Sequence, residues 1–155
     1  MKTFTTMLAA GLAAMSFAAA APAAAQLQVY EDYEPSEEVI EMTVVKVDEG
    51  QLDTYLEGLK STWVAANELQ KEMGYVKGYG IYTVPYNDGS FNLILTIRFA
   101  NTDALAPSKK RYMEFMEAWG KENMDQSNKT VLELYNKIRK IQGTYLLRGV
   151  DLMDD

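Results

Sequence analysis

The chain contains no cysteine and no histidine among its 155 residues. These absences exclude Ser-His-Asp and Cys-His catalysis, zinc sites built on Cys or His, and haem ligated by histidine. They also exclude disulfides, so a hydrophobic core has to supply the stability. Oxygen ligands remain available for Ca²⁺ or Mg²⁺, but no Asp-rich loop has the required spacing. We therefore expect neither a metal site nor a cofactor.

Positive charge is scarce as well. The chain has 15 Lys and Arg residues against 22 Asp and Glu residues, which gives a net charge of −7. Binding to a phosphate backbone requires a basic patch, so we expect no nucleic-acid partner.

The first 25 residues have the layout of a secretory signal peptide. Lys2 is followed by a short alanine-rich run over residues 7–21, by Pro22, and by three alanines that end at Ala25. The run is too short, and too soon interrupted by proline, for a membrane anchor. Cleavage after Ala25 removes one lysine and changes the net charge from −7 to −8. We expect a soluble bacterial protein, periplasmic or secreted, with no membrane anchor after cleavage.

Residues 26–38 are acidic, carry Pro35 and show no sustained period, which predicts a flexible arm. Tyr30 and Tyr33 leave open that this arm docks on its own domain or on a neighbour. Residues 39–153 are expected to form one domain, because the remaining length is too short for two well-packed ones.

Within this domain, hydrophobic periodicity predicts alternating strands and helices. Residues 39–47 are β-branched and predict a strand, and residues 52–73 have the apolar stripe of a helix. Residues 75–99 predict a β-hairpin around Asp88-Gly89, with Pro85 at a sheet edge or a strand end. Residues 107–141 predict two helices separated by a break at residues 125–128, with Gly143 as the stop. Residues 144–153 predict a final strand.

This order predicts an α+β fold: a ferredoxin-like β-α-β-β-α-β antiparallel sheet with helices on one face. The alternating apolar residues from Phe91 to Phe99 are expected to meet the helices. A second apolar set is expected on the opposite side of the sheet, at Ile40, Met42, Val44, Ile94, Leu146 and Val150. Such a patch usually marks an interface, so we expect two sheets to pair face to face in a homodimer.

The arrangement resembles the dimeric α/β-barrel superfamily. The resemblance covers residues 39–153 and is carried by EMTVVKVDEGQLDTYLEGLKSTW, GYVKGYGIYTV and FNLILTIRF. The superfamily includes antibiotic-biosynthesis monooxygenase-like, EthD-like and NIPSNAP-like domains, and the resemblance implies a dimer with two paired sheets. Its haem-binding members use histidine, which this chain lacks, and no catalytic residue matches position by position.

Alternation along the predicted strands places three cations, Lys46, Arg98 and Arg148, on the side of the sheet away from the helices. Cations on an enclosed face require partners. Carboxylates of a second subunit, or a small anionic ligand held by arginine, would satisfy them. Strand-end positions in solvent or in ordinary ion pairs are the alternative.

Aromatic residues form the second candidate site, a pocket between the sheet and the helices. Its predicted lining comprises Trp63, Tyr79, Tyr82, Tyr112, Trp119 and Tyr145. The alternative is an ordinary aromatic core that binds nothing.

Three kinds of function remain. The first is a secreted homodimer that binds a small aromatic or carboxylate-bearing molecule. The second, implied by the resemblance, is a cofactor-independent oxygenase or isomerase, in which Tyr, Asp, Glu or Lys would transfer protons. The third is a structural or interaction role in the cell envelope.

Overall fold

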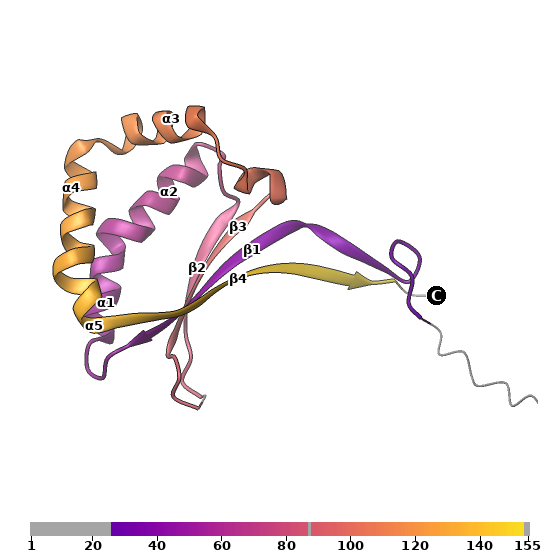
Figure 1. The fold of residues 1–155 in the computed structure, drawn as a ribbon, viewed down its shortest axis with the longest axis horizontal. Helices are drawn as coiled ribbons and strands as arrows, with labels where there is room; N and C mark the ends of the chain where they lie inside the picture. Colours follow the sequence, from indigo (N-terminus) through magenta and orange to yellow (C-terminus); the bar gives the residue numbers. More distant parts are fainter. Residues whose placement is uncertain (1–25, 87, 154–155) are drawn as a thin grey trace, which may run out of the picture.

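The computed structural model describes residues 26–86 and 88–153, so the predicted signal peptide over residues 1–25 lies outside the described residues. The chain begins with β1 (Tyr33–Val47), α1 (Leu52–Leu59), a π-helical segment (Lys60–Val64), α2 (Ala65–Glu72), β2 (Gly78–Thr83) and β3 (Leu93–Phe99). A 3₁₀ turn (Thr102–Leu105), α3 (Lys109–Trp119), α4 (Lys121–Thr130), a second π-helical segment (Val131–Tyr135), α5 (Asn136–Ile138) and β4 (Arg139–Leu152) follow (Figure 1).

The strands form one sheet in the order β2-β3-β1-β4, and all neighbours are antiparallel. β2 and β3 are a hairpin, whereas β1 and β4 pair across the whole length of the domain. Helices follow β1 and β3. This order defines the ferredoxin-like fold, and the predicted α+β class is confirmed. β2 is an edge strand that ends before Pro85, as expected for a residue that cannot donate to the ladder.

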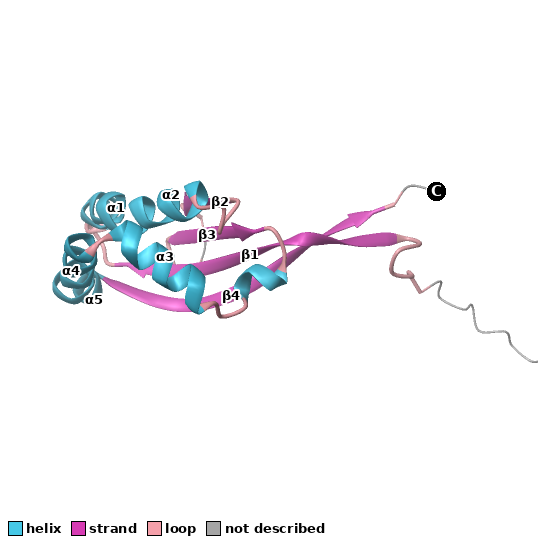
Figure 2. Cartoon of the chain, turned by 90° about the horizontal axis from the view of Figure 1, so that it is seen from above, coloured by secondary structure: helices cyan, strands magenta, loops and turns pink. Residues whose placement is uncertain are grey.

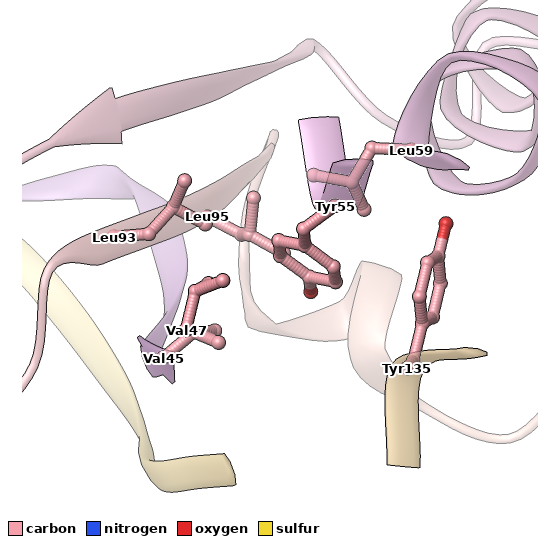
Figure 3. Close-up of a cluster of buried hydrophobic side chains, with 7 residues drawn as sticks. All are labelled: Val45, Val47, Tyr55, Leu59, Leu93, Leu95 and Tyr135. Atoms are coloured by element: carbon pink, nitrogen blue, oxygen red, sulfur yellow. The ribbon is translucent and has the colours of Figure 1, made fainter. Parts of the chain in front are cut away.

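The helices cover one face of the sheet, where the core lies. Val45 of β1 and Leu93 and Leu95 of β3 meet Tyr55 and Leu59 of α1 (Figure 3). Full burial of each such side chain contributes roughly 1.5–3 kcal/mol to folding. The alternating apolar stripe of β3 therefore faces the helices, as the sequence predicts.

The opposite side of the sheet, here called the outer face, consists of three rows of residues that lie opposite one another across the strands. In the order β2, β3, β1 and β4, the rows are Tyr82, Ile94, Val44 and Gly143; Gly80, Thr96, Met42 and Tyr145; and Gly78, Arg98, Ile40 and Leu147.

The predicted placement of Leu146 on the outer face is wrong. Leu146 pairs with Glu41 and belongs to the helix side. Val150, also predicted on the outer face, lies opposite Pro35, beyond a register shift in β1. A one-residue difference in register exchanges every side chain between the two faces. The register of β4 is set by its pairing with β1, where Gln142 is an extra residue between the Val44–Gly143 and Val45–Ile141 pairs.

β1 and β4 continue together beyond the other strands as a two-stranded ribbon (Figures 1 and 2). Tyr33 pairs with Leu152 there, and Pro35 pairs with Val150. The prediction of a flexible arm over residues 26–38 is therefore wrong for residues 33–38, which belong to β1, and β4 pairs with residues 33–35 of this segment. β4 itself begins at Arg139, five residues earlier than predicted.

The helical region also differs from the prediction. The break falls at Gly120, which has φ of 78°, and α4 runs through the predicted break at residues 125–128. Glycine adopts such a left-handed backbone without strain, which explains the turn between α3 and α4. Ile141 and Gly143, predicted as the end of the last helix, lie in β4.

Candidate ligand pocket

A pocket of about 380 Å³ lies between the helices and the sheet. Its floor comes from β1, β3 and β4, and its walls come from α1, α2, α3, α4 and the two π-helical segments. The lining residues are mostly apolar and aromatic: Thr43, Tyr55, Leu59, Thr62, Trp63, Ala66, Leu95, Phe115, Trp119, Ser127, Val131, Tyr135, Arg139 and Ile141. The volume falls in the usual range of small-molecule sites.

Aromatic side chains on four different elements form the walls. Tyr55 meets Tyr135 edge to face, with ring centroids 4.9 Å apart. Phe115 and Trp119, one turn apart on α3, stack with centroids 5.9 Å apart. Trp63 lines the pocket from the first π-helical segment. Such walls favour a flat apolar ligand, because ring stacking adds to the burial of apolar surface.

The two π-helical segments meet at this pocket. Tyr135 lies 2.6 Å from Thr62, hydroxyl to hydroxyl, and the Thr62 hydroxyl donates to the carbonyl of Gly58. Since Thr62 has one proton to give, Tyr135 must be the donor in their shared hydrogen bond. A Cβ atom at Gly58 would lie 2.8 Å from Cε1 of Tyr135, so glycine is what lets the ring approach. Isolated π-helical turns are frequent at functional sites.

Arg139, the first residue of β4, adds a cation to this wall. Its guanidinium carbon lies 5.5 Å from the ring centroid of Tyr55 and 5.2 Å from that of Tyr135. Its Nε atom and Oγ of Ser127 on α4 are both buried, and neither has a hydrogen-bond partner in the part of the chain that the structure describes. Among the described residues, no carboxylate forms an ion pair with Arg139. The pocket therefore carries two polar groups whose bonding capacity is unused.

Burial holds the pocket tyrosines in their neutral form. It raises the pKa of Tyr55 to about 12, against a smaller lowering effect of the Arg139 charge. Burial likewise raises the pKa of Tyr135. Both phenols are protonated at neutral pH, so they can act as hydrogen-bonding groups but not as bases.

The structure brings only part of the predicted aromatic set to the pocket. Trp63 and Trp119 line it. Tyr79 packs edge to face on Trp63 and donates a hydrogen bond to Glu68, outside the lining. Tyr82 and Tyr145 lie on the outer face, where each is more than half exposed, and Tyr112 is 60% exposed on α3. The prediction that Tyr79, Tyr82, Tyr112 and Tyr145 line the pocket is wrong.

The predicted cluster of cations is also divided. Lys46 and Arg98 lie on the outer side of the sheet by strand alternation, but Arg148 pairs with Val39 on the helix side. The guanidinium of Arg148 donates to the carbonyl of Ser36 at 2.9 Å, across the register shift of β1. The three cations do not form one site, because the register of β4 differs by one residue from the predicted one.

Sequence reasoning missed Tyr55, Phe115, Tyr135 and Arg139 as pocket residues. The sequence places Tyr55 and Tyr135 in predicted helices. An apolar residue on a predicted helix can belong either to a pocket or to a packed core. Arg139 falls within residues 107–141, which the sequence predicts to be helical. The change from helix to strand immediately before it turns its side chain toward Tyr55 and Tyr135 instead.

The described residues contain neither a metal-binding cluster nor a membrane-spanning helix. No group of three or more carboxylates there is arranged to hold a metal ion. None of the helices among residues 26–86 and 88–153 combines the length and apolar character that crossing a bilayer requires.

No protein-family model matches the chain, and no curated protein matches it. Solved structures resemble it in fold. Protein SO0527 from Shewanella oneidensis is 10% identical, with a TM-score of 0.45, and the match covers 77% of this chain and 99% of that one. A dimeric protein of unknown function with a ferredoxin-like fold from Bacteroides fragilis is 14% identical, with a TM-score of 0.40, over 77% of this chain and 100% of that one. A dabb family protein from Mesorhizobium loti is 10% identical, with a TM-score of 0.38, over 77% and 100%.

Proposed function

We propose that this protein is a homodimer that binds a small aromatic molecule in the pocket between its helices and its sheet. We further propose that it does so outside the cytoplasm, after removal of residues 1–25 by a signal peptidase. The observation that carries the binding proposal is the pocket of about 380 Å³ with its wall of aromatic rings.

Binding is favoured over proton-transfer catalysis by the chemistry of the lining. Among the described residues that line the pocket there is no carboxylate. A general base needs a pKa near the operating pH. Tyr55 has a pKa of about 12, far above that range. The pocket is therefore better suited to hold and orient a ligand than to take a proton from it.

The binding proposal is tested by filling the pocket. Ala66 lines it from α2, and replacing it by phenylalanine places a ring in the ligand space. We expect 1-naphthol and related small aromatic compounds to bind the wild-type protein by isothermal titration calorimetry and Ala66→Phe to lose that binding. Ala118→Phe, at an exposed position of α3, is the control and should bind like the wild-type protein. Unchanged binding in Ala66→Phe, or no binding by the wild-type protein, would reject the pocket as the site.

The homodimer proposal is supported by the composition of the outer face. Ile40, Met42 and Ile94 are apolar and only half-buried. Tyr82, Tyr145 and Leu147 are 56%, 53% and 40% exposed. A second copy that packs its own outer face here, around a two-fold axis, would bury this surface.

Glycines flatten this face and make such packing feasible. A Cβ atom at Gly80 would lie 2.6 Å from the hydroxyl of Tyr82, and one at Gly143 would lie 2.9 Å from the hydroxyl of Tyr145. Each tyrosine therefore lies back over the glycine two residues before it. The two tyrosine rings lie at opposite edges of the sheet. They give the outer face a broad contact area from which no side chain protrudes far.

Two adjacent leucines test the homodimer. Leu147 is on the outer face and Leu146 is on the helix side, and both are substantially exposed. We expect light scattering to give a dimer for the wild-type protein and for Leu146→Asp, and a monomer or a much weaker dimer for Leu147→Asp. A monomeric wild-type protein, or equal effects of the two substitutions, would contradict pairing through the outer face.

A further inference from the structure

Arg139 is a cation on the wall of an apolar pocket to which the described residues contribute no carboxylate. Its backbone is fixed by pairing with Val47 at the end of β1. Its side chain is half-buried and lies over Tyr55 and Tyr135. Contacts with β1, α1 and the second π-helical segment therefore hold the guanidinium at the pocket wall.

The ring contacts do not satisfy the hydrogen-bonding capacity of this guanidinium. An arginine has five N–H donors in one plane, and a partly buried one normally uses them on carboxylates or carbonyls. The Nε–H of Arg139 is buried, and no described residue supplies it with an acceptor. An unused buried donor on a charged group is costly, and an acceptor supplied by a ligand removes that cost.

The aromatic part of the pocket lining matches the rest of such a ligand. Trp63, Phe115 and Trp119 present aromatic surface in the same cavity as Arg139. A flat apolar body with one anionic group would use both features. Carboxylates fit the guanidinium particularly well, because their two oxygens accept parallel hydrogen bonds from Nε and one terminal nitrogen.

We propose that the pocket selects an aromatic carboxylate, with the carboxylate bound by Arg139 and the ring packed between Trp63 and the Phe115–Trp119 pair. This inference rests on the proposed binding function and specifies its ligand class. The competing role of Arg139 is purely structural: a cation that holds the rings of Tyr55 and Tyr135 in place.

A pair of isosteric probes separates the two roles. 1-Naphthoate and 1-naphthamide have the same ring and nearly the same shape, but only the first is charged. By isothermal titration calorimetry, we expect the wild-type protein to bind the carboxylate at least about tenfold more tightly than the amide, because charge-assisted bonds are about twice as strong as neutral ones.

Substitution of the arginine tests the assignment. Arg139→Met keeps a long apolar stem and should remove the preference for the carboxylate while retaining binding of the amide. Arg139→Lys keeps the charge without the planar fork and should show an intermediate preference. Lys137→Met, at an exposed position two residues earlier, removes the same charge outside the pocket and should leave the preference unchanged.

The outcomes are distinguishable. Equal affinities for the two probes in the wild-type protein would overturn the aromatic-carboxylate inference and leave the proposed binding function standing. Binding of neither probe would overturn both. A preference that persists in Arg139→Met, or that disappears in Lys137→Met, would remove Arg139 as its source. Because the wild-type comparison decides the ligand class by itself, the result does not depend on the folding of a variant.

Discussion

At the residue scale, the pocket depends on glycine as much as on aromatic side chains. Gly58 sits one helical turn before Thr62 and lets Tyr135 approach α1 closely enough to bond with that threonine. A glycine in a helix is unfavourable by about 1 kcal/mol relative to alanine. Its presence here is explained by the close approach of the tyrosine ring.

We predict that Gly58→Ala destabilises the protein by about 1 kcal/mol. The added Cβ would lie 2.8 Å from the buried ring of Tyr135. Overpacking of this kind costs about 1–3 kcal/mol, and the gain in helix propensity offsets about 1 kcal/mol of it. Urea unfolding measures the change. Glu57→Ala, at the adjacent exposed position, is the control, and a Gly58→Ala protein as stable as that control would contradict the close packing.

Tyr55 gives a prediction about alkaline pH. Burial raises its pKa to about 12, whereas a tyrosine in the unfolded chain has a pKa of about 10. The unfolded state therefore loses this proton first. The contribution of Tyr55 to the free energy of unfolding is complete below pH of about 10 and is lost as the pH rises from about 10 toward 12.

Urea unfolding over this pH range provides the measurement. We expect the decline in stability to become shallower in Tyr55→Phe, with a residual decline from Tyr135, whose pKa is also raised. Tyr86→Phe is the matched control, because the Tyr86 side chain is 93% exposed. A Tyr55→Phe protein with the same pH dependence as the wild-type protein would show that Tyr55 is not the group responsible.

At the scale of elements, the side chain of Asn92 extends the sheet immediately before the first residue of β3. Oδ1 of Asn92 accepts a hydrogen bond from the Val47 amide, and Nδ2 donates to the Val47 carbonyl, both at 2.8 Å. The amide of Asn92 also donates to the Val45 carbonyl. The asparagine thereby acts as one more strand residue beside the buried end of β1.

We predict that Asn92→Ala lowers the free energy of unfolding by about 2–3 kcal/mol, because it leaves the amide and carbonyl of buried Val47 without this partner. Asn128→Ala, at an exposed position of α4, removes the same side chain and is expected to change stability by less than about 0.5 kcal/mol. Urea unfolding of both variants measures the difference. Similar effects of the two substitutions would contradict the role assigned to Asn92.

At the scale of the whole molecule, the two faces of the sheet differ in what covers them and in the residues that they present. The helix side encloses the pocket, and the outer face carries exposed tyrosines above glycines. In the proposed dimer, each subunit therefore keeps its own pocket while the outer faces are buried. The ribbon of β1 and β4 adds further exposed apolar residues, including Val150 and Leu152.

The export of the protein is predicted from residues 1–25. Expressed in a bacterial host, the chain should be recovered from the periplasm or the medium with Gln26 as its first residue. Intact-mass measurement of the purified protein checks the cleavage position. Ala25→Asp, which places a charge where a small residue is required, should slow processing. Recovery of the uncleaved wild-type chain from the cytoplasm would contradict the prediction.

The sequence determined the element order and therefore the fold. Alternation along residues 93–99 and the helical stripe over residues 52–73 required a sheet with one face covered by helices, since apolar residues at these periods must be buried together. Trp63 and Trp119 were identified as pocket residues because bulky aromatics on such stripes point to the covered face.

The tertiary structure alone decided the site. The faces of Tyr145 and Arg148 depend on the register of β4, which is set by pairing with β1 more than ninety positions away and by the extra residue Gln142. Neither is encoded in local periodicity, because one residue of shift leaves the pattern of the strand intact and exchanges its faces. The meeting of Arg139 with Tyr55 and Tyr135 likewise required α1, the second π-helical segment and β4 to be in place together.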